Sequence, residues 1–351
     1  MAPHNKYFGT GGVDGSLQFE LNNGENTGPG HRTTLQFYAN YLTSKSPLAD
    51  LIAAGVYASV RSCGGPVVPL RLGRKDAASA GSAGVPQPQN SVVSFRQQFD
   101  RMGFTATEMI QLVACGHTLG SVHSTEFPQI VPESVGQAPF DTTNTQFDNK
   151  VATEYVAGTT TNPLVVGASI AVGRHSDFKV YSSDGNATIS TLTDPTVFRN
   201  TCQAMLQKMI EVVPEGVTLT EPISPYAVKP VDMQLTLNTG GTSFLLTGFI
   251  RVRTTEVPAS SIENVVLTWK DRSGGNSCGS SATCSTTATL QGVSTGFDDT
   301  FGVCTSPAHI PPIVVLTTLV LPHRSDNSDC SRHLVVHPCG ELQRRVKRDI
   351  R

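Results

Sequence analysis

The chain has 351 residues, of which 38% are hydrophobic and 15% are charged, and its formal net charge is −2. This length is sufficient for two ordinary domains. The near-neutral balance without a basic stripe argues against a nucleic-acid-binding protein, and the lack of a run of about 18 apolar residues argues against a membrane-spanning helix.

The first two-thirds of the sequence predicts helices. Apolar residues recur every three to four positions over residues 34–60, with a break near Ser46 and Pro47. Thr105 and Glu108 have the spacing of a capping box, which marks the start of the helix expected from residue 105. A loop rich in glycine and proline is expected over residues 63–88, and further helices are expected over 91–101, 105–115, 149–156 and 195–212.

The pattern changes after residue 213. Four prolines between Pro214 and Pro230 indicate a linker. Apolar residues alternate with their neighbours over 244–252, and β-rich runs follow at 265–269 and 313–321, which is typical of a small all-β, sandwich-like domain. The predicted divisions are a helical domain over 1–215, a linker over 216–230, a cysteine-containing β-domain over 231–340 and a charged tail over 341–351.

Five of the eight cysteines lie in the last 80 residues, in a region rich in glycine, serine and threonine. Such density favours disulfides and an oxidising compartment, and no Cys/His spacing fits a zinc site. Cys278 and Cys284 are close enough for a local bridge. Cys304, Cys330 and Cys339 then leave one cysteine over.

Residues 109–123 (MIQLVACGHTLGSVH) form the most informative segment, because a capped helix delivers His117 at its C-terminal end. A lone histidine in such a place is most often a core or capping residue, so its interpretation depends on the surrounding motifs. The segment closely resembles the proximal-histidine motif of the plant, fungal and bacterial haem peroxidase superfamily, in which a small residue precedes the pattern His-Thr-x-Gly.

Three further segments resemble motifs of the same superfamily. Residues 68–77 (VPLRLGRKDA) look like its Pro-x-x-x-Gly-Arg-x-Asp loop, and residues 140–148 (FDTTNTQFD) look like its Phe-Asp-x-Thr-x-x-x-Phe-Asp segment. Residues 11–16 (GGVDGS) look like its Gly-x-Asp-x-Ser segment. Because four motifs occur in the family's order, the resemblance implies a mainly α haem-peroxidase fold over about residues 1–215.

The resemblance implies that His117 is the proximal ligand of the iron of haem b. In the family, a buried carboxylate accepts the other ring N–H, which raises the basicity of the ligand and fixes its tautomer. By its position before the last large helix, Asp184 is the expected partner. Asp194 is the competitor, although Asp-Pro at a helix start reads more simply as an N-cap.

The resemblance also implies further binding residues. His123 is expected to approach a haem propionate, the alternative being an exposed loop histidine. The proximal calcium loop of the family implies a ligand set on the C-terminal side of His117, namely Thr118, Asp141, Thr143, Gln146 and Asp148. Hydroxyl, carbonyl and carboxylate oxygens suit calcium. An incomplete distal calcium site is implied at Gly12 (carbonyl), Asp14 and Ser16.

The distal half of the expected site has no counterpart in the sequence. Peroxide activation needs a base and a cation, which the family supplies as Arg-x-x-x-His-Asp upstream of residues 11–16. His4 has no arginine before it and is a poor substitute. Residues 1–10 also lack a signal peptide. We therefore expect an N-terminal truncation, which is also consistent with Cys63, whose partner in fungal relatives lies upstream. Cys115 and Cys202, on the helices flanking the proximal side, could pair or be core residues.

The implied function is that of a secreted, fungal-type haem peroxidase, which uses hydrogen peroxide to oxidise a small or phenolic reductant. Without the distal residues the chain could be inactive. The alternative is a non-catalytic protein with a degenerate peroxidase fold that binds haem. A cell-wall or polysaccharide contact through the β-domain is a further prediction, and neither nucleic acid nor a membrane is an expected partner.

Overall fold

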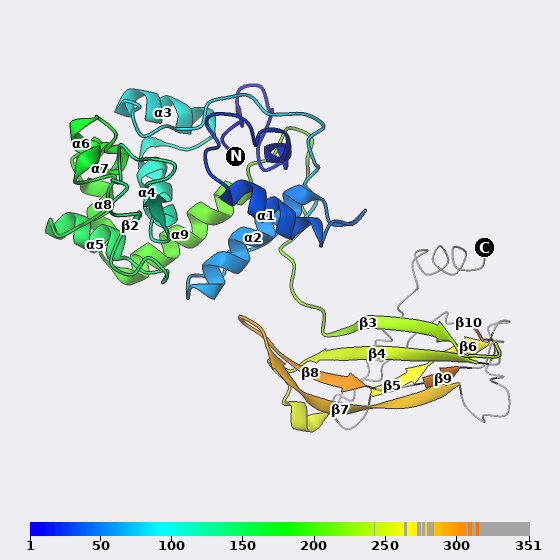
Figure 1. Ribbon diagram of the computed structural model, residues 1–351. Helices are drawn as coiled ribbons and strands as arrows, with labels where there is room; N and C mark the ends of the chain where they lie inside the picture. The colour runs from blue at the N-terminus through cyan, green and yellow to red at the C-terminus, as the bar shows by residue number, and fades with distance from the viewer. Residues whose placement is uncertain are drawn as a thin grey trace. The chain divides into compact units, whose positions relative to one another are not determined.

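The computed structural model describes residues 1–315, except 242, 263–264, 272–274, 276–277, 279–283, 306–307 and 311–313. The chain forms two compact units, Met1–Ile223 and a second that begins at Ser224 (Figure 1). The predicted strand at 313–321, apart from Val314 and Val315, lies outside the described residues. So do Cys330, Cys339 and the predicted tail.

The first unit is helical, as the sequence predicted. Its helices are α1 (Gly30–Ala39), α2 (Leu48–Ser62), α3 (Val92–Arg101), α4 (Ala106–Gly116), α5 (Lys150–Ala157), α6 (Ala168–Ala171), α7 (Ser176–Tyr181), α8 (Ala187–Thr191) and α9 (Pro195–Ile210). Short 3-10 turns lie at Ser16–Phe19 and Ser182–Asp184, and β1 (Ser121–His123) pairs with β2 (Gln137–Pro139). The helical pattern over 34–60 corresponds to α1 and α2, and the break expected near Ser46 and Pro47 falls immediately before α2. The short α6, α7 and α8 were not expected.

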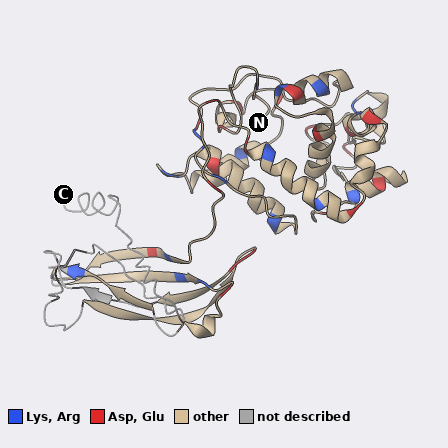
Figure 2. Ribbon diagram, turned by 180° about the vertical axis from the view of Figure 1, so that it is seen from behind, with Lys and Arg blue, Asp and Glu red and all other residues tan. Residues whose placement is uncertain are grey.

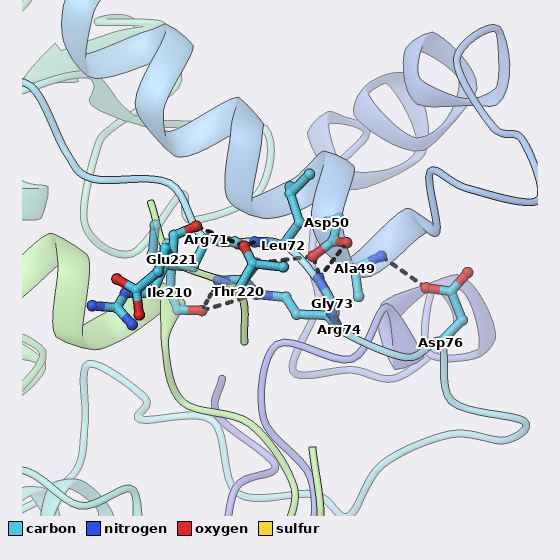
Figure 3. A network of polar contacts seen from close by, with 10 residues as sticks. All are labelled: Ala49, Asp50, Arg71, Leu72, Gly73, Arg74, Asp76, Ile210, Thr220 and Glu221. Carbon is cyan, nitrogen blue, oxygen red and sulfur yellow. Dashed lines mark hydrogen bonds and ion pairs between the residues drawn. The ribbon is translucent and has the colours of Figure 1, made fainter. Parts of the chain in front are cut away.

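A polar network around Arg74 joins the ends of two long helices (Figure 3). The buried Arg74 guanidinium lies 2.9 Å from the Asp50 carboxylate in α2, and its Nε and Nη2 donate to the Ile210 carbonyl at the end of α9, at 3.0 and 2.6 Å. Asp76 accepts hydrogen bonds from the Leu48 and Ala49 amides at 2.9 and 2.8 Å, which satisfies the N-terminus of α2. The Gly-Arg-x-Asp segment therefore holds the start of α2 and the end of α9, and α4 packs against α9.

The second unit is an antiparallel β-structure. Its strands are β3 (Val228–Leu237), β4 (Phe244–Arg253), β5 (Val265–Thr268), β6 (Lys270–Asp271), β7 (Ser285–Thr295), β8 (Thr300–Thr305), β9 (Ala308–Ile310) and β10 (Val314–Val315). The sheet has the order β3-β4-β8-β7-β5 with β9 beside β4, while β10 pairs with β6. Ile250, Val265, Leu267, Ala288 and Cys304 share one buried cluster.

Strand β3 begins inside the predicted linker. Its first residues, Val228 to Pro230, pair with β4, although the prolines of this region indicated an unstructured connection. Proline is compatible with an edge strand because its missing N–H is not needed there, and β3 lies at the end of the strand order. The ladder between β3 and β4 is irregular between Val231 and Gln234, where Asp232 has a φ of 53°.

Two disulfides lie in the described part of the chain. Cys115 in α4 is bonded to Cys202 in α9, and Cys278 is bonded to Cys284, as the local spacing suggested. Cys63 and Cys304 form no disulfide with another described residue.

No helix among the described residues is long and apolar enough to cross a bilayer. Acidic and basic residues are interspersed along the described ribbon, without a continuous stripe of either sign (Figure 2).

Candidate functional site

His117 stands at the C-terminal end of α4, where it is the capping residue. The start of this helix is fixed by the expected capping box, in which the Thr105 amide donates to Glu108 at 2.8 Å and the Glu108 amide donates to Thr105 at 3.2 Å. Glu108 also accepts from Lys208 of α9 at 2.6 Å. The helix that carries His117 is thus held at its start by polar contacts and near its end by the disulfide of Cys115.

The partner of His117 is Asp177. The imidazole Nδ1 lies 2.7 Å from the Asp177 Oδ2, and the carboxylate is almost fully buried. Burial alone would lower the pKa of His117, but the charge and hydrogen bond of Asp177 outweigh it and raise that pKa. Asp177 also accepts from Asn162 Nδ2 at 2.9 Å and from the Tyr181 hydroxyl at 3.5 Å.

The expected partner, Asp184, was the wrong carboxylate. It is exposed and accepts hydrogen bonds from the Thr188 amide and hydroxyl at 3.0 and 2.5 Å, so it satisfies the start of α8. Asp194 does cap α9, accepting from the Thr196 and Val197 amides at 2.8 and 2.9 Å, with proline in the first turn. Both residues accept hydrogen bonds from the first turn of a nearby helix, whereas Asp177 is buried in α7.

His117 borders a cavity of about 640 Å³. Phe95, Phe99, Val113, Phe127, Ile130, Leu164 and Val180 give it a mainly apolar lining. The His117 side chain retains 31% of its surface exposed. Because Nδ1 is engaged by Asp177, Nε2 is the ring nitrogen left for a metal. A large apolar cavity beside one imidazole nitrogen fits a haem bound through its iron.

His123 lines the same cavity from β1, with an exposed side chain. The structure therefore brings together the two histidines that the sequence singled out. No arginine or lysine lines this cavity among the described residues. His4 lies elsewhere: its ring contacts the Gly11 carbonyl at 3.1 Å, and it borders a second cavity with Met102 and Lys208.

Phe140 stacks on the imidazole of His117. The ring centroids are 4.2 Å apart and the planes differ by 7°. Phe140 is the first residue of the segment 140–148. The stretch of chain that resembles a calcium loop therefore also restricts the orientation of the His117 imidazole ring. Together with the hydrogen bond to Asp177, this contact fixes the orientation of the ring.

The residues of the expected calcium loop lie close to one another. The Thr118 hydroxyl donates to the Asp148 carbonyl at 2.6 Å, and the Thr143 hydroxyl donates to the Asp148 carboxylate at 2.9 Å. The Thr143 amide donates to Asp141 Oδ1 at 2.9 Å, whereas Gln146 is exposed and its amide donates to the Thr143 carbonyl at 2.7 Å.

Asp141 carries the strongest indication that the loop needs a cation. It is fully buried, and its Oδ2 has no hydrogen-bond partner. Burial raises the pKa of Asp141 to about 6, and the charges of Asp148 and Glu154 add to this effect. A buried oxygen without a partner is costly unless a cation binds it, so the donor set fits calcium. The described residues contain no group of three or more His, Cys, Asp or Glu placed to hold a metal, so hydroxyl and carbonyl oxygens would complete the set.

The expected distal calcium residues are also buried in part. Asp14 and Ser16 are 7% and 4% exposed, and the Ser16 amide donates to Asp14 Oδ1 at 3.1 Å. Gly12 has a φ of 138°, and a side chain there would collide with the Val212 carbonyl. The hydrogen bond that the Asp14 side chain accepts from Ser16 therefore lies within a tight turn of residues 12–16.

Four residues of the site were missed from the sequence: Asn162, Asp177, Tyr181 and Phe140. A signal for Asp177 was present, because Val180 and Tyr181 follow it at helical spacing and place it on the buried face of a short helix. Asp184 is followed instead by Gly185 and Asn186, which is typical of a helix end. Asn162 is nearly fully buried but comes from a loop without a local pattern.

Comparison with known proteins agrees with this geometry. A family model described as peroxidase matches residues 4–212, which is more than half of the chain. A WSC domain-containing protein of Arthroderma benhamiae is 50% identical over 318 residues, covering 89% of this chain and 43% of that protein. L-ascorbate peroxidase 5, peroxisomal, of Arabidopsis thaliana is 30% identical over 184 residues, covering 50% of this chain and 62% of that protein. The chain spans less than two thirds of either relative. It belongs to the peroxidase family, within the haem peroxidase superfamily that its motifs indicated.

Proposed function

We propose that the chain is a haem peroxidase in which His117 binds the iron of haem b and hydrogen peroxide is used to oxidise a small or phenolic donor. The observation that carries this proposal is the hydrogen bond between His117 and the buried Asp177, beside a mainly apolar cavity of about 640 Å³. The relatives named as peroxidases support the class of reaction.

Asp177, Phe140 and the apolar lining of the cavity would each contribute to the reaction. Asp177 holds the Nδ1 proton of His117 and gives the imidazole anionic character. Phe140 keeps the ring plane fixed, and the apolar lining excludes water from the proximal side. The bound haem would supply the iron at which peroxide is reduced.

His117→Ala is expected to abolish binding of haem through the proximal side, because the only described imidazole with a carboxylate partner is removed. The full chain and the variant would be titrated with haem, and the Soret band and its ligand-field bands would be recorded. His175→Ala is a matched control, since His175 is a partly buried histidine that does not line the cavity.

A Soret band of equal intensity in wild type and His117→Ala would contradict the ligand assignment. Haem binding without any oxidation of a phenolic donor by hydrogen peroxide would instead favour the alternative, a non-catalytic haem-binding protein.

For the loop that contains Asp141 we propose a calcium site that braces the end of α4. Calcium at about one hundred times its dissociation constant should then raise the free energy of unfolding by roughly 2.7 kcal/mol. Urea unfolding with calcium and with a chelator would measure this. The difference should vanish in Asp141→Asn and persist in Asp184→Asn; an equal calcium effect in both variants would contradict the proposal.

For the second unit we propose a binding role, with a polysaccharide as the candidate ligand and the extracellular space as its place of action. Phe249 on β4 supports it, because this aromatic residue is 42% exposed. An exposed aromatic ring is the kind of surface that packs on sugar rings. Full-length Phe249→Ala should lose retention on insoluble polysaccharide, whereas Phe178→Ala, an exposed phenylalanine of the first unit, should not. Equal retention would contradict this role.

A further inference from the structure

Two tyrosines connect the carboxylate partner of His117 to the protein surface. Tyr181 is fully buried in α7, and its hydroxyl lies 3.5 Å from Asp177 Oδ2. Its ring meets the ring of Tyr155 edge to face, with centroids 5.1 Å apart and planes at 74°. Tyr155 comes from α5, so three helices contribute to one continuous line of contacts from His117 outward.

The far end of this line reaches solvent. The Tyr155 hydroxyl donates to Asn186 Oδ1 at 3.0 Å, and Asn186 is exposed. Asn186 has a φ of 67°, a conformation that asparagine tolerates better than most residues. The contacts therefore run from a fully buried phenol to a phenol whose oxygen lies at the surface.

Both phenols hold their protons at neutral pH. Burial raises the pKa of Tyr181 well above its usual value, and the charge of Asp177 adds to this. Burial also raises the pKa of Tyr155, with a contribution from Asp184. A neutral phenol can give up an electron only if its proton finds an acceptor. The Asp177 carboxylate accepts from the Tyr181 hydroxyl and can take its proton, and solvent beside the exposed Asn186 can take the proton of Tyr155.

We propose that Tyr181 and Tyr155 form a relay that moves oxidising equivalents from the haem site to the surface, and that Tyr155 is a second oxidation site for phenolic groups on polymers. This inference rests on the haem function proposed above. A polymer cannot enter a cavity of about 640 Å³ that haem itself would fill, whereas Tyr155 is reached without entering it.

The steps balance in electrons and protons. In the haem-loaded chain, Tyr181 would give one electron to the cofactor once a peroxide had oxidised it, and the phenolic proton of Tyr181 would pass to the Asp177 carboxylate. The Tyr181 radical then takes an electron from Tyr155 and recovers its proton from Asp177, while the proton of Tyr155 passes to water. A phenol of the polymer finally gives one electron and one proton to Tyr155 and becomes a phenoxyl radical. Two such cycles consume the two oxidising equivalents of one peroxide.

The relay can be tested by locating the radical in the full-length chain. The haem-loaded chain would be mixed with m-chloroperoxybenzoic acid and a nitroso spin trap, and the adducts would be located by peptide mass spectrometry. We expect an adduct on Tyr155 in the wild type. It should be lost in Tyr181→Phe, which keeps the buried ring and removes only the hydroxyl. Tyr226→Phe, which changes an exposed phenol outside the relay, should leave it unchanged.

The Soret band of each loaded sample separates the two proposals. Its absence would contradict the haem assignment, whereas a normal Soret band that changes with the peracid shows that the oxidant is present. With that change observed, an adduct on Tyr155 that persists in Tyr181→Phe would overturn the relay. So would a Tyr155→Phe variant that still oxidises a polymer-linked phenol as fast as the wild type.

Discussion

Asp177→Ala is expected to weaken haem binding by roughly 10–100-fold, because the carboxylate that orients the proposed iron ligand is removed. It should also lower the free energy of unfolding by several kcal/mol. Asn162 and Tyr181 would lose a buried acceptor along with His117, and each unsatisfied buried group costs about 1–3 kcal/mol. Haem titration and urea unfolding would measure the two effects.

The matched control is Asp184→Ala, which removes a carboxylate seven positions along the same stretch of chain. Because Asp184 is exposed and accepts its hydrogen bonds from Thr188 at the start of α8, the variant should lose about 1 kcal/mol of stability and bind haem normally. Asp177→Asn separates charge from hydrogen bonding, since its amide oxygen can still accept from His117. If Asp184→Ala impaired haem binding more than Asp177→Ala, the assignment made from the geometry would be wrong.

The second large effect is expected for the double variant Cys115→Ala and Cys202→Ala. These cysteines are 87 residues apart, and opening a loop of that length costs about 4.5 kcal/mol in the chain-entropy account. The free energy of unfolding from urea titration is the quantity to compare. Cys278→Ala with Cys284→Ala is the internal control, because that loop spans only six residues and should cost about 2 kcal/mol.

An equal loss in the two double variants would contradict the loop-length explanation. A second readout is haem uptake, because Cys115 lies two residues before His117 and the bridge holds that end of α4 against α9. We expect haem uptake to decline in the Cys115 and Cys202 variant and to be unchanged in the Cys278 and Cys284 variant.

The elements that follow from local rules could be predicted. The capping box of Thr105 and Glu108 places α4 correctly, and the cap of Asp194 with Pro195 places the start of α9. The position of His117 at the end of a helix follows from the first of these. Even the bridge of Cys278 and Cys284 is a local feature, set by a separation of six residues.

The parts of the site that depend on distant contacts could not be predicted. The bond between His117 and Asp177 joins residues 60 positions apart, and the choice of Asp184 depended on position along the chain rather than on burial. The stacking of Phe140 and the bond from Asn162 likewise arise from packing. Strand β3 was missed for another reason: its prolines indicate a linker unless the strand is known to be at an edge.

That edge has a consequence for the behaviour of the protein at high concentration. A long, regular edge strand offers unpaired amides and carbonyls to other molecules and can seed aggregation. Pro230 removes one of these donors from β3, and the irregularity at Asp232 bends the strand where a second chain would have to align. A β3 without these two features would offer a straight edge to which a strand of a second molecule can pair, so Pro230 and the irregularity at Asp232 oppose intermolecular strand addition.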